Sequence, residues 1–270
     1  MLNNVDNRDI MDLESACGLD RGEISEILFE GIRYTDDESS GNKPVEYIKF
    51  EDLIIYTQPL FSLKDDKPIA AEVLIRSCDN RVTAEEVLTN MKKTNRIHEL
   101  DLMIIEKVCS SRLWEKLGVQ RVNINLSAET LEMHKIAYII VYILKKYNAI
   151  NNITLELNED TLYYSDVVMR NIQAMVDSNI QISLDDFNVS LGWITVINKY
   201  GIQELKYKYN DNTELRRLKT LETIASALRI RLVIEKVPDN MAMNELKNLD
   251  IDIVQSYITG RPAYALKLVS

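Results

Sequence analysis

Two kinds of apolar spacing alternate along the chain from residue 50 onward. Apolar residues at helical spacing predict helices, for example at Ile97/Leu100/Ile104/Val108, Met133/Ile136/Ile140/Leu144 and Leu215/Leu218/Leu221/Ile224/Leu228. Short runs of β-forming residues predict strands at 53–63, 69–77, 121–126, 153–157, 180–184, 204–205, 232–234 and 251–254. A repeated strand-then-helix order favours a parallel sheet, and eight strands over about 220 residues predict a TIM-like (β/α)8 barrel rather than an open sheet.

The first connection differs from the others because it is too short to hold a helix. Residues 64–68, with the sequence Lys-Asp-Asp-Lys-Pro, join the first two predicted strands. Parallel neighbours need a long crossover, whereas antiparallel neighbours can be joined by a tight turn. We therefore expect the first strand to run antiparallel to the rest.

The amino-terminal segment differs in charge from the remainder. Residues 1–40 contain eleven Asp or Glu and three Arg, a net charge of −8, and this acidic segment ends in a turn-rich stretch at 35–44. We expect an acidic extension over 1–48 and the barrel domain over 49–270. Ile24, Ile27, Leu28 and Ile32 have helical spacing. That helix either packs on the barrel or forms an arm that binds a protein partner.

The overall charge excludes some classes of partner. The chain has 32 Lys plus Arg against 42 Asp plus Glu, a formal net charge of −10, which disfavours binding to a nucleic-acid polymer. No apolar run reaches the 18 or more residues that would predict membrane insertion, and the amino terminus does not resemble a secretory signal. Three widely spaced cysteines predict no disulfide framework. These features predict a cytoplasmic protein.

Polar residues follow the apolar part of most predicted strands. From Asn125 they recur at intervals of 20–31 residues, about one strand-helix unit each. The set comprises Glu72, Asn125, Glu156, Asp185, Asp186, Lys206, Glu235 and Gln255. The carboxyl ends of barrel strands converge on one face, where barrel enzymes place their chemistry. A single such residue is ordinarily a solvated strand end, but a succession of them predicts a site.

The residue types in this set indicate the chemistry. Carboxylates with one amide form an oxygen cage suited to Mg²⁺ or Mn²⁺ rather than zinc. So many carboxylates repel one another unless cations are present. The adjacent Asp185 and Asp186 can serve two metal ions, and paired metals are a common device for phosphoester hydrolysis. Lys206 could orient the attacking water or stabilise developing charge on phosphate.

Eight motifs, in order over about residues 50–265, resemble the EAL domain, the cyclic di-GMP phosphodiesterase module of bacterial signalling. They are Gln58-Pro59, Ala71-Glu72-Val73-Leu74-Ile75-Arg76, Val122-Asn-Ile-Asn-Leu-Ser127, Leu155-Glu-Leu-Asn-Glu159, Leu184-Asp-Asp-Phe187, Glu204-Leu-Lys206, Ile234-Glu-Lys-Val237, and Val254-Gln-Ser-Tyr257 with Arg261-Pro262. The resemblance also implies a barrel of the EAL type whose first strand is antiparallel, as the short connection indicates independently.

The resemblance implies roles for individual residues and two Mg²⁺ or Mn²⁺ ions per active site. One metal would be held by Glu72, Asn125, Glu156 and Asp185. Asp185, Asp186 and Glu235 would serve the second. Lys206, Glu235 and Gln255 would be the catalytic residues, with Lys206 and Gln255 positioning the attacking water. Gln58 and Arg76 would contact the nucleotide, and Glu159 would anchor the loop after Asp186. The implied reaction converts cyclic di-GMP to the linear pGpG.

Several positions depart from the family pattern. Asn188 and Ser190 replace two glycines in the loop after the Asp-Asp pair, which makes that loop bulkier. Lys208 replaces an aspartate, Lys236 a glycine, and Pro238 a glutamate. These changes leave open an alternative in which the domain is a cyclic di-GMP receptor or protein-interaction module without turnover.

The resemblance also predicts a homodimer, through an apolar stripe next to the altered loop. The stripe comprises Leu191, Trp193, Ile194 and Ile197. The alternative is that these residues face the barrel.

Overall fold

The computed structural model describes residues 48–158, 160–161, 165–187, 197, 199–210 and 214–269. Residues 1–47, which include the predicted helix and all but the last residue of the predicted acidic extension, lie outside this range. Within it, the strands are β1 (Leu53–Ser62), β2 (Lys67–Ser77), β3 (Arg121–Asn125), β4 (Ile153–Asn158), β5 (Gln181–Asp185), β6 (Glu204–Lys208), β7 (Arg231–Glu235), β8 (Ile253–Gln255) and β9 (Ala263–Lys267).

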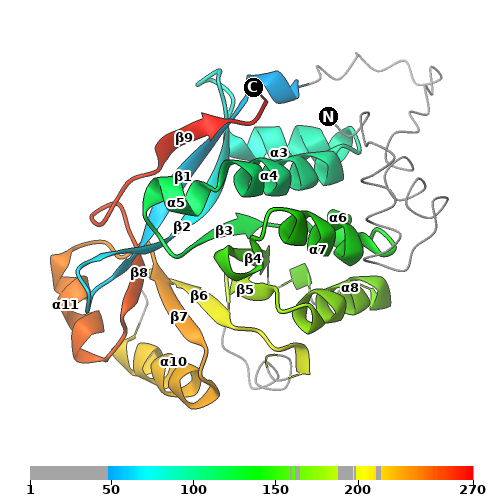
Figure 1. Ribbon diagram of the computed structural model, residues 1–270. Helices are drawn as coiled ribbons and strands as arrows, with labels where there is room; N and C mark the ends of the chain where they lie inside the picture. Colours follow the sequence, from blue (N-terminus) through cyan, green and yellow to red (C-terminus); the bar gives the residue numbers. More distant parts are fainter. Residues whose placement is uncertain are drawn as a thin grey trace.

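These strands form one sheet that closes into a barrel with helices around its outside (Figure 1). The pairs from β2–β3 through β7–β8 are parallel, as the strand-helix alternation predicts. β1 pairs antiparallel with both β2 and β8, which closes the barrel and confirms the prediction for the first strand. β9, which the sequence pattern did not predict, pairs antiparallel with β1.

The helices fill most of the connections between parallel strands. They are α3 (Ala84–Lys93), α4 (Ile97–Ser111), α5 (Leu113–Leu117), α6 (Ala128–Leu131), α7 (Ile136–Lys146), α8 (Asp166–Asp177), α10 (Leu215–Leu228) and α11 (Asn240–Asn248), with 3₁₀ turns at Phe50–Asp52 and Ile150–Asn152. The helices predicted around Ile97 and Leu215 are confirmed. The one predicted from Met133 begins only at Ile136, because Lys135 has a left-handed backbone with φ 62°.

The interior of the barrel is apolar on one side and polar on the other. Leu60, Ala70, Val233 and Ile253, from β1, β2, β7 and β8, pack together. The equivalent inward positions of β3 to β6 are polar and fully buried, namely Asn123, Thr154, Ser183 and Glu204. Inward side chains form layers in such a barrel, so the polar half of this layer lies directly below the strand ends.

No described helix is long and apolar enough to cross a lipid bilayer.

A buried carboxylate ties α4 to the start of α6. Oδ2 of Asp101 accepts hydrogen bonds from the Ser127 amide at 3.0 Å and from the Thr130 hydroxyl at 2.6 Å. Burial raises the pKa of Asp101 to about 6, although these bonds lower it in part.

This pKa predicts a pH-dependent stability difference between the wild type and Asp101→Asn. A raised carboxyl pKa favours folding at pH below 3.8, and that advantage is lost as pH rises through about 6. Asp101→Asn cannot ionise, so at pH 7 its free energy of unfolding should exceed that of the wild type by up to about 3 kcal/mol. In urea titrations this difference should shrink towards pH 4. Parallel pH profiles of the two proteins would contradict the shifted pKa.

Candidate active site

The polar residues predicted at the strand ends converge at one mouth of the barrel. We call them the strand-end ring: Glu72, Asn125, Glu156, Asp185, Asp186, Lys206, Glu235 and Gln255. The strand register brings them together, since Asn125 lies opposite Glu156 in the β3–β4 pair and Glu235 opposite Gln255 in the β7–β8 pair. Gln58 on β1 lies directly opposite Glu72 on β2.

Lys206 lies at the centre of the strand-end ring and is fully buried. Its Nζ lies 2.7 Å from Glu235 Oε1, 3.0 Å from Glu156 Oε1, 3.1 Å from Glu72 Oε2 and 3.9 Å from Asp185 Oδ1. Burial lowers the pKa of this lysine, but the four carboxylates outweigh burial and hold the pKa well above its usual value. Lys206 is therefore protonated at neutral pH.

One ammonium group does not neutralise the carboxylates around it. Burial raises the pKa of Glu72, but Lys206 and hydrogen bonds from Gln255 and Asn125 bring it below its usual value. The pKa values of Glu156, Asp185 and Glu235 stay raised, because burial and neighbouring carboxylates exceed the effect of Lys206. The site thus has an unmet demand for positive charge.

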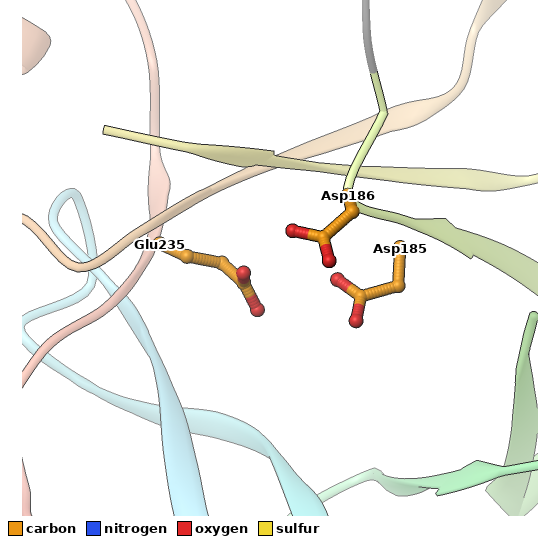
Figure 2. Close-up of side chains that lie close together, drawn as sticks. All are labelled: Asp185, Asp186 and Glu235. Carbon is orange, nitrogen blue, oxygen red and sulfur yellow. The ribbon is translucent and has the colours of Figure 1, made fainter. Parts of the chain in front are cut away.

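Three carboxylates of the ring point toward one another and form what we call the acidic trio: Asp185, Asp186 and Glu235 (Figure 2). One oxygen from each lies within 4.8 Å of the others. Asp185 Oδ1 is buried without a hydrogen-bond partner, although Lys206 Nζ is 3.9 Å away. Asp186 adopts a left-handed backbone with φ 53°, which an aspartate tolerates.

The donor set fits a hard divalent cation. The ring offers carboxylate oxygens and one amide, the ligands that Mg²⁺ and Mn²⁺ prefer. The raised carboxyl pKa values and the unpartnered oxygen of Asp185 are what a cation at this place would relieve.

A cavity of about 530 Å³ opens next to the ring. Gln58, Glu72, Asp185, Lys208, Glu235, Lys236, Val237, Pro238, Gln255, Ser256, Tyr257 and Ile258 line it. Gln255 Nε2 donates to Glu72 Oε2 at 2.6 Å, and Gln58 Nε2 donates to the Gly260 carbonyl at 3.2 Å. The two glutamines are thus held with their amides at the cavity wall.

Of the two remaining predicted site residues, Arg76 and Glu159, only Arg76 lies among the described residues. Arg76 lies on β2 four residues after Glu72 and donates from Nη1 to the Ile75 carbonyl at 2.7 Å. Four residues along a strand return to the same face, so Arg76 shares the face of Glu72. Glu159 and the altered loop with Asn188 and Ser190 lie outside the described residues.

A buried ionic cluster lies directly below the ring, and the prediction of site residues did not include it. Asn123 Nδ2 donates to Glu156 Oε1 at 2.8 Å and to Glu204 Oε1 at 2.7 Å. Glu204 also pairs with Arg121 and Arg231. The sequence could have predicted this cluster, because strand side chains alternate between two faces. Asn123 and Glu204, two positions before Asn125 and Lys206, must therefore point into the barrel with them.

Lys208 and Lys236, two of the positions that depart from the family pattern, line the cavity. Lys208 Nζ lies 2.9 Å from Asp186 Oδ1, and that hydrogen bond raises the pKa of Lys208. Lys236, with φ 55°, stands directly after Glu235 and lines the same cavity.

The fold and the ring together define an α/β barrel protein with a carboxylate-rich site at the mouth of the barrel. A model of the EAL domain matches residues 46–262, so the chain belongs to the EAL domain family.

Two curated proteins are similar in sequence. Signaling protein YkoW of Bacillus subtilis is 24% identical over 80% of this chain and 29% of its own length. Cyclic di-GMP phosphodiesterase PdeA of Borreliella burgdorferi is 23% identical over 82% of this chain and 36% of its own length. The chain thus spans about a third of the length of these curated relatives.

Solved structures share the fold. The PaMucR phosphodiesterase in complex with c-di-GMP has a TM-score of 0.70 and 21% identity, covering 79% of this chain and 98% of that one. The FimX EAL domain of Pseudomonas aeruginosa bound to c-di-GMP has a TM-score of 0.68 and 18% identity, covering 78% and 91%. At these identities the likeness supports the barrel architecture.

Proposed function

We propose that this chain hydrolyses one phosphodiester of cyclic di-GMP to give pGpG in a reaction that depends on Mg²⁺ or Mn²⁺. The observation that carries the proposal is the strand-end ring, with carboxylates grouped around the buried Lys206 in an EAL-family barrel. A relative named as a cyclic di-GMP phosphodiesterase and a solved c-di-GMP complex support the choice of substrate.

The proposed roles follow the contacts in the ring. Glu72, Asn125, Glu156 and Asp185 hold one metal, and the acidic trio serves a second. Divalent ions at these places supply charge neutralisation of the phosphate and activation of water. Lys206 is protonated and is held among Glu72, Glu156 and Glu235, so its fixed positive charge can stabilise negative charge on an attacking water or a phosphate oxygen near the ring. Gln255 orients the attacking water, and Gln58 and Arg76 contact the nucleotide.

The test is direct incubation of the full chain with cyclic di-GMP and Mg²⁺ or Mn²⁺, followed by chromatography for pGpG. We expect metal-dependent pGpG formation that stops in EDTA. Substrate that remains intact at every metal concentration, with a folded protein, would rule out the enzyme.

A receptor without turnover is the second candidate. The observation that favours it is the ion pair between Lys208 and Asp186, which occupies a proposed metal ligand with a protein cation. Lys236 adds positive charge to the same cavity, and phosphates bind lysines through charge-assisted hydrogen bonds. Calorimetry in EDTA that detects cyclic di-GMP binding, together with no pGpG in metal, would select this function.

The context of the domain is also a proposal. We infer a cytoplasmic protein in which the acidic 1–48 segment contacts a protein partner and the chain pairs as a homodimer. Of the predicted dimer stripe, Ile197 is buried in the core, which matches the alternative that these residues face the barrel. Leu191, Trp193 and Ile194 lie outside the described residues.

A further inference from the structure

Lys208 lies between two carboxylates of the acidic trio. In the β6–β7 pair it stands directly opposite Glu235. On the β5 side its Nζ contacts Asp186 Oδ1 at 2.9 Å. A lysine ammonium therefore lies beside the oxygens that the proposed second metal would need.

The backbone fixes this placement. Lys208 is two residues after the inward-facing Lys206, so both side chains project from the same face of β6. The Phe187 amide donates to the Lys206 carbonyl at 3.0 Å, and the Tyr209 amide donates to the Glu235 carbonyl at 2.9 Å. These bonds extend the sheet beyond its last paired residues and hold Asp186, Lys208 and Glu235 side by side.

We propose that Lys208 is a resident cation at the second of the two metal positions, so that the chain binds one divalent ion tightly and a second much more weakly. The inference rests on the proposed metal-dependent function. A lysine donates hydrogen bonds and offers no ligand oxygen, so it competes with a cation for Asp186 rather than helping to hold it.

The charges of the site support one tight ion rather than two. Five carboxylates contact or surround two lysines, Lys206 and Lys208, and their formal charges of −5 and +2 leave −3. One divalent ion reduces this to −1, whereas two would overshoot to +1. Even if Lys208 moved away from Asp186, its charge would still repel a second ion a few ångströms away.

The test is a Mn²⁺ titration of the full chain, by calorimetry and by electron paramagnetic resonance of free Mn²⁺. In the wild type we expect one tight ion and a second that binds at least about tenfold more weakly. Lys208→Met, which keeps an unbranched side chain one atom shorter and removes its charge, should tighten the second ion by about tenfold or more. Lys208 is 42% exposed, so the substitution should not disturb the core, and Lys208→Gln repeats the test with a polar side chain.

Lys236→Gly is the matched control. It removes the same charge from the same cavity, and glycine suits its φ of 55°, but it leaves the Lys208–Asp186 pair in place. We expect it to tighten the second ion by less than either Lys208 variant does, because Asp186 stays paired with Lys208.

Three results would overturn the inference: two equally tight ions in the wild type, no Mn²⁺ binding by any of these proteins, or an unchanged second affinity in both Lys208 variants. Hydrolysis is measured separately. Absence of pGpG with the expected two-step titration would refute the proposed enzyme and leave the role of Lys208 supported.

Discussion

Asp185→Asn is expected to reduce cyclic di-GMP hydrolysis by about 1000-fold or more, because this carboxylate contributes to both proposed metal positions. The same change should raise the melting temperature of the metal-free protein. Burial and neighbouring carboxylates raise the pKa of Asp185, so holding its charge at neutral pH disfavours the fold, and an amide removes that cost. The measurements are pGpG formation with Mn²⁺ and thermal unfolding in EDTA.

Asp66→Asn is the matched control for this variant. Asp66 lies in the exposed turn between β1 and β2 and, like many asparagines, has a positive φ, here 53°. The control therefore makes the same chemical change far from the ring, and we expect it to alter neither the rate nor the metal-free stability. Full activity in Asp185→Asn would remove the metal assignment from this residue.

The barrel could be predicted because its signals are local. Apolar runs of strand length, separated by helical spacing, recur along the chain, and the short turn at 63–66 forces β1 and β2 to be antiparallel. β9 escaped prediction because it lies at the surface, with none of its five residues buried. Such a strand lacks the apolar alternation that marks a half-buried one.

The ring could be predicted for a related reason. Parallel strands place their last residues on one face of the barrel, so the sequence alone predicts that Asn125, Glu156 and Glu235 lie close together. The layer below them, with Asn123 and Glu204, was missed although strand alternation places both inside. The ion pair between Lys208 and Asp186 could not be predicted from the spacing of residues along the chain. It depends on how β5, β6 and β7 align beyond their last paired residues.

Glu204→Gln is expected to destabilise the fold by about 3–5 kcal/mol, which is the usual cost of breaking a buried ion pair from one side. Glu204 is fully buried and pairs with Arg121 and Arg231. Glutamine keeps the size of the side chain but leaves two guanidinium groups without their counter-charge. Urea unfolding with a constant m-value would measure the loss.

Glu115→Gln is the control at the surface. Glu115 pairs with Arg112, and both side chains are about half exposed. An exposed ion pair contributes little to stability, so the free energy of unfolding of this variant should lie within about 1 kcal/mol of the wild-type value. A similar small loss in Glu204→Gln would mean that Arg121 and Arg231 find solvent or other partners.

The same cluster should govern acid unfolding. Burial raises the pKa of Glu204, but Arg121, Arg231 and the hydrogen bonds to the carboxylate outweigh it and bring the pKa to about 2. A lowered carboxyl pKa contributes stability that is complete above 4.5 and is lost as pH falls towards 2. The wild type should therefore lose about 3 kcal/mol from this group over that range, a loss that Glu204→Gln cannot show. Unfolding curves for the two proteins should converge as the pH is lowered, and a constant gap between them would show that Glu204 does not titrate with the fold.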